Sequence, residues 1–393
     1  MGGITEDHIK QDIDDAMNVG FDGFGINIGD PTQSWIPTPL ENLFGYAETR
    51  GFKLFISLDV SATASACAGG SIGACGGPNS YHDLLSSHLA STAWFKGANG
   101  LPMISTFSSG GWEAQEWTAW RDSLANKMYF VPEFDDTANY YQDSSSWWDY
   151  WGSTVEGLFS WDAAWPSGSA GNLSEGDISP EQNVMEGAAS RGKGYMMAIS
   201  TLQYKNANDG PESHYIGNIW PEASTDPASA KYATQILAPH TSWLPLISSF
   251  ITAYKTSSPM YPPSSTPAVG AMWHSTILST ADCPSDTKPS GFSLAKDQIN
   301  WSIVLPSTAS GYTVSLVSGC EELGSVKLMP GLNYGATSTI KPGRQRMVVT
   351  DEEGKVVLAA SNRRDVSAGC PDGIYNMNPQ VVGLGDDASA DEC

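Results

Sequence analysis

Two hydrophobic periods alternate along the first 200 residues. Ile9, Ile13 and Met17 recur every four residues behind Thr5, which can cap a helix that Gly20 would end. The next stretch, 21–28 (FDGFGINI), is instead typical of a short buried strand. Further strands are predicted at 52–59, 103–107, 127–133, 158–162 and 194–200. Further helices are predicted at 40–50, 113–124 and 181–191.

Strands that alternate with helices favour parallel pairing with right-handed crossovers. No glycine-rich dinucleotide loop follows the first strand, so the pattern favours an α/β fold of the TIM-type (β/α) barrel over a doubly wound sheet. Six barrel strands are predicted, not eight, because the chain begins with a helix and no helix-strand pair separates Ser200 from Asp209. The apolar segment 243–255 is expected to be the last barrel helix.

The pattern changes after residue 255. A segment rich in proline and serine (SSPMYPPSSTP) predicts an extended linker. Beyond it, the period-two segments 301–305, 312–317, 325–328 and 346–349 predict antiparallel strands of a β-sandwich. We therefore expect a barrel-like catalytic domain at 1–256, a linker at 257–267, and a β-sandwich with an acidic tail at 268–393.

Charge restricts the partners of this chain. Acids outnumber bases by 43 to 20, which gives a net charge of −23. Such a chain repels nucleic acid and anionic membrane surfaces, whose binding requires cationic side chains. No apolar run reaches the roughly 18 residues that a membrane span needs. We expect neither nucleic acid nor membrane as a partner, whereas a neutral polymer such as a glucan is compatible with this charge.

The cysteines indicate an oxidising compartment. The chain has six, and none forms a CxxC or a Cys/His pattern, so neither a metal nor a cofactor is expected. Cys67 and Cys75 flank a glycine-rich stretch and can close a small disulfide loop. Asn-x-Ser sequons at Asn172 and Asn300 point the same way. No signal peptide follows Met1, so a leader has been removed or the true start lies upstream.

Acidic residues close three of the predicted strands. Asp59 ends FISLD, Glu133 and Asp135 end FVPEFD, and Asp162 ends LFSWD. The carboxyl ends of barrel strands form the catalytic mouth, and an acid there is at the rim or paired. The alternative for each acid is that it caps the following helix or binds a backbone amide.

The most distinctive segment is 208–217 (NDGPESHYIG). A Gly-Pro turn separates Asp209 from Glu212 and can aim both carboxylates at one space. Glycoside hydrolysis needs two such groups, a protonated acid and a carboxylate that activates water or attacks carbon. The alternative is an acidic surface loop, but His214 and Tyr215 beside the pair suit sugar hydroxyls.

These motifs resemble glycoside hydrolase family 71, the fungal α-1,3-glucanases called mutanases. The hallmark of that family resembles WNDYGESHYIG, and here both acids keep their spacing while SHYIG is intact. The resemblance covers nearly the whole chain. Other matching segments are FDGFGIN at 21, FKLFISLD at 52, ISTF at 104, YFVPEFDD at 129, LFSWDAAWP at 158, GKGYMMAIS at 192 and CPDGIYNMN at 370.

The resemblance implies a secreted or cell-wall inverting hydrolase of α-1,3-glucan, expected to be a monomer. It implies that Asp209 and Glu212 are the acid/base pair and that Asp59 is a third active-site acid. Inversion requires about 6.5–9.5 Å between the two carboxyl groups, so the turn must splay them. The residues expected to line the glucan cleft are Glu133, Asp135, Trp161, Asp162, His214 and Tyr215.

The chain departs from the family pattern in two places. Met1 falls just past the family's first strand, and the stretch before the hallmark is shorter, with Ala207 where the family has Trp. A barrel without two strands has unpaired edges. Two alternatives to an active enzyme follow: an incomplete gene model, or a non-catalytic relative that binds glucan or associates with the cell wall.

Overall fold

The computed structural model describes residues 3–124, 127–161, 178–199, 215–223, 234, 236, 238–289, 292–337, 339–376 and 378–385. The chain divides into two compact units, the first made almost entirely of residues before 201 and the second almost entirely of residues after 200. Each unit is described by itself below.

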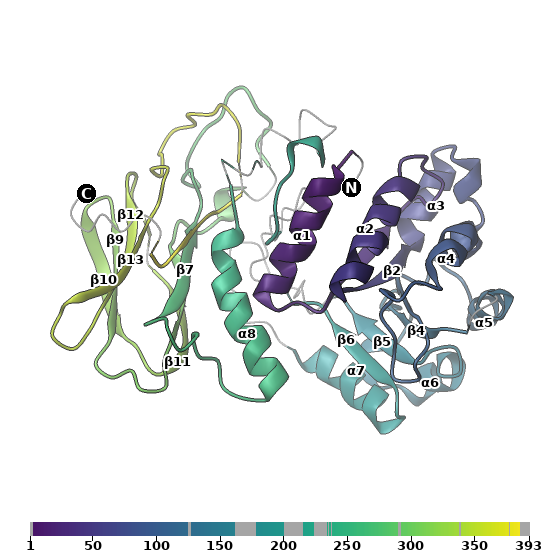
Figure 1. The fold of residues 1–393 in the computed structure, drawn as a ribbon. Coiled ribbons are helices and arrows are strands. Elements are labelled where there is room, and N and C mark those ends of the chain that lie inside the picture. Colours follow the sequence, from purple (N-terminus) through teal and green to yellow (C-terminus); the bar gives the residue numbers. More distant parts are fainter. Residues whose placement is uncertain are drawn as a thin grey trace. The chain divides into compact units, whose positions relative to one another are not determined.

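Unit 1 alternates strands with helices (Figure 1). Its strands are β1 Gly23–Ile28, β2 Lys53–Asp59, β3 Met103–Phe107, β4 Tyr129–Pro132, β5 Gly157–Ser160 and β6 Gly194–Met197. Its α-helices are α1 Glu6–Val19, α2 Pro37–Arg50, α3 Val60–Ala68, α4 His82–His88, α5 Ala114–Ser123, α6 Ser145–Trp151 and α7 Ser179–Ser190.

The strands of unit 1 pair in parallel. One sheet has the order β1-β2-β3-β4, and β5 pairs with β6 in a second, two-stranded sheet. All six strands predicted from the sequence are present, which confirms a mixed α/β fold with parallel pairing. Closure into a barrel stays a prediction.

Helix ends follow the capping residues of the sequence. The Thr5 hydroxyl accepts a hydrogen bond from the His8 amide at the start of α1, 3.3 Å away. Gly51 ends α2 in the left-handed conformation, with φ of 72°, which residues with a Cβ adopt only at a cost. Both ends match the prediction, whereas α3, α4 and α6 were not predicted.

The core of unit 1 is strongly aromatic. The apolar face of α1 buries Ile9 and Ile13, as its four-residue period predicts. Leu54, Ile56 and Leu58 of β2 are fully buried in the same cluster. Most tryptophans of this unit also lie inside the cluster, namely Trp94, Trp117, Trp120, Trp147, Trp148 and Trp151. The high tryptophan content therefore serves mainly to fill this core.

The described part of unit 2 contains eight strands in two antiparallel sheets, β10-β9-β12-β13 and β11-β8-β7-β14, together with helix α8, Leu244–Thr256 (Figure 1). The strands are β7 Val269–His274, β8 Asn300–Leu305, β9 Thr313–Ser318, β10 Glu321–Lys327, β11 Gly331–Ala336, β12 Gln345–Thr350, β13 Val356–Ser361 and β14 Gln380–Gly383. The four strands predicted here, β8, β9, β10 and β12, are confirmed, as is helix α8.

Both antiparallel sheets contribute to one hydrophobic cluster. Met272 and Ile303 come from one sheet, and Leu316 and Met347 come from the other. The β-sandwich and the domain limits 1–256, 257–267 and 268–393 stay predictions. The division into compact units places α8 in unit 2, whereas the predicted limit of the first domain, residue 256, includes this helix in that domain.

Two disulfides are present among the cysteines that the structure describes. Cys67 and Cys75 are bonded, as their spacing suggested, and Cys283 is bonded to Cys370. The first disulfide links Cys67, in the last turn of α3, to Cys75, and the second links two segments of unit 2. Among the helices that the structure describes, none is both long and apolar enough for a membrane span.

Burial on β2 leads to a stability prediction. Ile56 is fully buried, whereas Ile72 is 86% exposed, so the two residues offer a matched pair of isoleucine truncations. Ile56→Ala should lower the free energy of unfolding by about 2–5 kcal/mol, and Ile72→Ala by less than about 0.5 kcal/mol. Urea denaturation of both variants measures this difference. Equal urea midpoints would contradict the packing described for β2.

Candidate functional site

The carboxyl ends of β1 to β4 meet at one edge of the parallel sheet. Asp59 is the last residue of β2 and is the register partner of Phe107, the last residue of β3. Glu133 directly follows β4, and its amide donates to Thr106 of β3 over 3.3 Å. Asp59 and Glu133 therefore follow strands that flank β3 on either side, with backbones about 10 Å apart by strand spacing.

Asp59 is held by two donors. Its Oδ1 accepts a hydrogen bond of 2.8 Å from the Ala62 amide at the start of α3. Its Oδ2 accepts one of 3.0 Å from the side-chain amide of Asn27 on β1. The helix-capping alternative for this acid is thus correct for one oxygen, while the other is positioned from the neighbouring strand. The side chain remains partly exposed, which suits a carboxylate that acts on a ligand.

Glu133 is fully buried. Its oxygens accept hydrogen bonds from the amides of Ser108 (2.9 Å) and Asp135 (3.1 Å). Burial is the main cause that raises the pKa of Glu133 well above the usual range, and the neighbouring Asp135 carboxylate adds to it. The raised pKa favours the protonated form of Glu133 at neutral pH.

Two further acids order the loops at this edge. Asp135 is partly exposed, and one of its oxygens lies 3.4 Å from the Tyr141 hydroxyl, which donates to it. The carboxylate of Asp136 accepts from the amide and the hydroxyl of Ser109, at 2.9 and 2.7 Å. Asp136 thereby ties the loop after β4 to the loop after β3.

Trp161 directly follows β5 and is half-buried. Its ring meets Phe107 edge-on, with centroids 5.9 Å apart, and Phe159 at the same distance. The contact with Phe107 brings the end of β5 next to the end of β3. The structure therefore gathers Asp59, Glu133, Asp135 and Trp161 at the strand ends of unit 1.

Tyr215 belongs to unit 2. Its hydroxyl donates to the carbonyl of Ala238 over 2.6 Å, and its ring stacks on His240 with centroids 3.9 Å apart. Burial raises the pKa of Tyr215 and lowers that of His240 to about 4. The neutral His240 ring and Tyr215 thus form a packed pair, and contact of Tyr215 with sugar stays a prediction.

The remaining predicted site residues are Asp162, Asp209, Glu212 and His214. They lie outside the residues that the structure describes, as does the Gly-Pro turn between Asp209 and Glu212. Their roles therefore stay predictions from the sequence.

The strand-end site can combine a fixed carboxylate with a hydrogen-bonding rim. Asp59 and Asp135 are partly exposed carboxylates, and Trp161 adds a flat aromatic ring at the end of β5. Such groups suit the hydroxyls and apolar faces of a sugar. Among the described residues no cluster of three His, Cys, Asp or Glu side chains could hold a metal ion.

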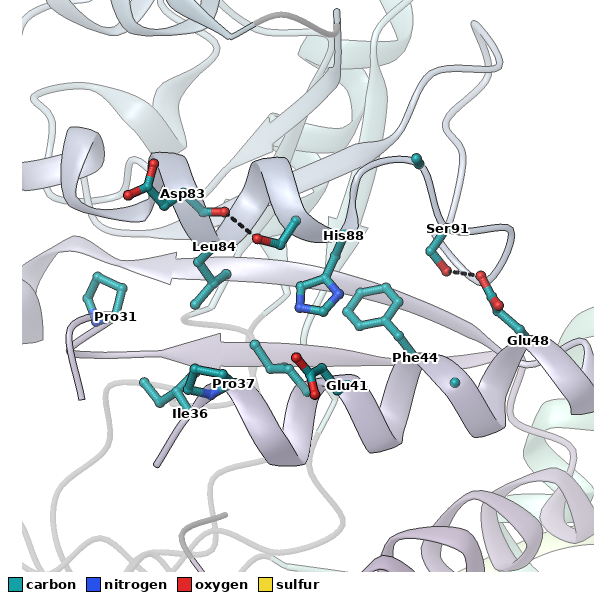
Figure 2. Close-up of a pocket in the computed structure, with 14 residues that line it drawn as sticks. Pro31, Ile36, Pro37, Glu41, Phe44, Glu48, Asp83, Leu84, His88 and Ser91 are labelled. Atoms are coloured by element: carbon teal, nitrogen blue, oxygen red, sulfur yellow. Dashed lines mark hydrogen bonds between the residues drawn. The ribbon is translucent and has the colours of Figure 1, made fainter. Parts of the chain in front are cut away.

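A hollow of about 670 Å³ lies between α2 and α4, and Figure 2 shows residues that line it. Phe44 and His88 stack in it with ring centroids 4.6 Å apart, and Glu41 and Glu48 also line it. No described member of the predicted site lines this hollow, so it is separate from the strand-end site.

The sequence model of glycosyl hydrolase family 71 matches residues 1–207 and 208–392. The chain belongs to glycosyl hydrolase family 71. This match confirms the resemblance drawn from the hallmark segment and the strand motifs.

A curated relative of this family 71 chain is glucan endo-1,3-alpha-glucosidase agn1 of Schizosaccharomyces pombe. The two sequences are 29% identical over 296 residues, which is 64% of this chain and 62% of the relative. The chain thus spans somewhat less than two thirds of the length of that relative.

Similar solved structures include two of Bacteroides uniformis beta-glucuronidase 2, one a calcium-binding mutant and one bound to a covalent ligand. Their TM-scores are 0.41 and 0.42, and their sequence identities are 10% and 9%. Each match covers 93% of this chain, and the matches cover 43% and 44% of the glucuronidase chains. The xylanase Xyn30A of Clostridium acetobutylicum has a TM-score of 0.32 at 11% identity, over 86% of this chain and 91% of that one. Likenesses at this level do not define the fold of this family 71 chain.

Sequence reasoning missed three residues that shape the family 71 strand-end site. Asn27 positions Asp59, Asp136 ties two loops together, and Tyr141 contacts Asp135. Asn27 ends the FDGFGIN segment and Asp136 ends YFVPEFDD, so both lie in motifs that were already singled out. A search for polar residues at every strand end would have found these two.

Burial of Glu133 leads to a pH prediction. Because the folded protein keeps a proton on Glu133 that the unfolded chain releases near the ordinary carboxyl pKa, unfolding free energy falls as pH rises above that value. Glu133→Gln carries no such proton. The stability of the wild type relative to this variant should therefore decrease from pH 5 to pH 8 in urea denaturation.

The exposed Glu186→Gln on α7 is the matched control and should keep the pH slope of the wild type. Stability curves of wild type and Glu133→Gln that run parallel over this range would show that Glu133 is charged in the folded protein.

Proposed function

We propose that this chain hydrolyses α-1,3-glucosidic bonds of fungal cell-wall α-glucan. The observation that carries the proposal is the family 71 match over both halves of the chain, which includes the hallmark segment. The curated relative is named a glucan endo-1,3-alpha-glucosidase, and the same substrate class is transferred here as part of the proposal.

The strand-end geometry supports hydrolytic chemistry. Asp59 is a partly exposed carboxylate fixed at the carboxyl end of a parallel strand, where barrel enzymes place catalytic groups. Two N–H donors hold it, so it is oriented before any ligand arrives. Preorganised charge of this kind can stabilise the positive charge that develops on the sugar ring.

The proposed mechanism is inverting and uses two carboxyl groups. Asp209 and Glu212 form the acid/base pair, and one protonates the leaving oxygen while the other activates water on the opposite face of the sugar. Glu133 is buried, and its carboxyl group accepts a hydrogen bond from the Asp135 amide. It would therefore position Asp135 rather than contact sugar. Trp161, Asp162, His214 and Tyr215 would line the glucan cleft with Asp135.

The architecture that belongs to this proposal is a (β/α) barrel at 1–256 followed by a β-sandwich at 268–393. The protein would act as a secreted or cell-wall monomer. The two disulfides support an oxidising compartment.

A glucan-binding relative without turnover is the second candidate. The observation that favours it is the number of parallel strands, since the described part of unit 1 contains six and a closed barrel of this type has eight. Binding of α-1,3-glucan without any release of reducing ends would select this second candidate.

The catalytic roles give a mutational prediction. The wild type should release reducing ends from insoluble α-1,3-glucan, and Asp209→Asn, Glu212→Gln and Asp59→Asn should each lower the rate by at least about 100-fold, because each removes a charge or a transferable proton. The exposed Asp122→Asn on α5 is the matched control and should retain the wild-type rate. A near wild-type rate for one of the three variants would remove that residue from the reaction.

A further inference from the structure

A second hollow, of about 380 Å³, opens in unit 1 where the loops after β3 and β4 meet α6. We call it the aromatic groove. Its lining includes Trp112 and Glu113 from the first loop, Thr137 from the second, and Trp147 and Tyr150 from α6.

The aromatic groove exposes flat rings above an apolar floor. Tyr150 is 48% exposed and Trp112 is partly exposed, whereas Trp147 is almost fully buried. The rings of Tyr150 and Trp112 are therefore accessible to a ligand, while the buried Trp147 packs beneath them in the hydrophobic core. Pyranose rings carry apolar CH faces that pack on aromatic faces and hydroxyls that bond at their edges.

The rings of the aromatic groove are fixed by their neighbours. The backbone of Gly77 lies against Trp112, because a Cβ built there would be 2.8 Å from the indole atom Cζ2. The Tyr150 hydroxyl donates to the carboxylate of Glu113, which also caps α5. A ligand that binds on these rings therefore orders few side chains, which lowers the entropic cost of binding.

The aromatic groove is continuous with the strand-end site through one loop. Ser109 lines the groove and is bonded to Asp136, and the preceding residue, Ser108, donates its amide to Glu133. The aromatic groove and the strand-end site thus both lie at the edge formed by the carboxyl ends of β3 and β4. A polymer that occupied the strand-end site would pass this loop.

We infer that the aromatic groove is a second glucan-binding subsite, which holds a part of the α-glucan chain away from the bond that is cleaved. The rings take the sugar faces, and the Glu113 carboxylate accepts hydrogen bonds from hydroxyls. The Glu113 carboxylate and the net charge of −23 disfavour an anionic ligand. The inference rests on the proposed function for the identity of the polymer.

The test is binding of the full chain to insoluble α-1,3-glucan, measured as protein depleted from solution. Tyr150→Ala removes an exposed ring and should weaken binding by about 3- to 10-fold, the value of one aromatic contact. Tyr150→Phe keeps the ring and should retain more affinity than Tyr150→Ala. In polymer hydrolysis, Tyr150→Ala should raise KM more than it lowers kcat.

The control is Tyr254→Ala, which removes a tyrosine of α8 that is 77% exposed, and it should bind as the wild type does. Equal binding by Tyr150→Ala and the wild type, or no binding by the wild type, overturns the subsite. Binding that depends on Tyr150 without release of reducing ends supports the subsite and rejects the proposed hydrolysis, so the two failures are distinguishable.

Discussion

The parallel register of β1 to β4 is the constraint on which the strand-end site depends. Parallel strands bring their carboxyl ends to one edge of the sheet. Asn27, Asp59 and Glu133 therefore lie at the same edge although they are far apart in the sequence. A shift of one residue in the pairing of β2 would turn Asp59 to the opposite face of the sheet. The fully buried Leu54, Ile56 and Leu58 of β2 oppose such a shift, because it would remove them from the core.

Some acids at this edge are buried and hold the loops, whereas others are partly exposed and can contact a ligand. Glu133 is buried, and it anchors the amides of two loops. Asp59 is partly exposed and oriented by Asn27 and the start of α3. The exposed rings of the aromatic groove extend the same edge outward. Burial therefore gives Asp59, Glu133 and Asp135 different roles. The buried Glu133 favours its protonated form, whereas Asp59 and Asp135 are partly exposed and can contact a ligand.

The sequence predicted those parts of the fold in which local pattern and tertiary environment agree. The six parallel strands carry apolar runs, and α1 and α2 have both a periodic face and a capping residue. Helix α3 was missed because its small residues (VSATASACA) show no apolar period, and α4 and α6 because they span only seven residues each. In unit 2, β7 and β14 were missed because their buried residues run consecutively instead of alternating.

The sequence indicated which acids follow the parallel strands but not the contacts that hold them. Acids at strand ends indicated the edge, yet the hydrogen bond between Asn27 and Asp59 joins residues 32 apart and needs the sheet register. The full burial of Glu133 was not visible in the sequence, which placed it with Asp135 as a cleft residue. The pairing of Cys283 with Cys370 was equally inaccessible, because six cysteines allow many connectivities.

We propose that Asp209 and Glu212, together with Asp59 at the end of β2, cleave α-1,3-glucan with inversion. The most direct measurement follows the anomeric protons of a soluble α-1,3-glucan oligosaccharide by NMR during the first minutes of reaction. The account predicts that the β-anomer of the new reducing end appears first and then mutarotates. First appearance of the α-anomer, or no cleavage by a folded protein, would contradict it.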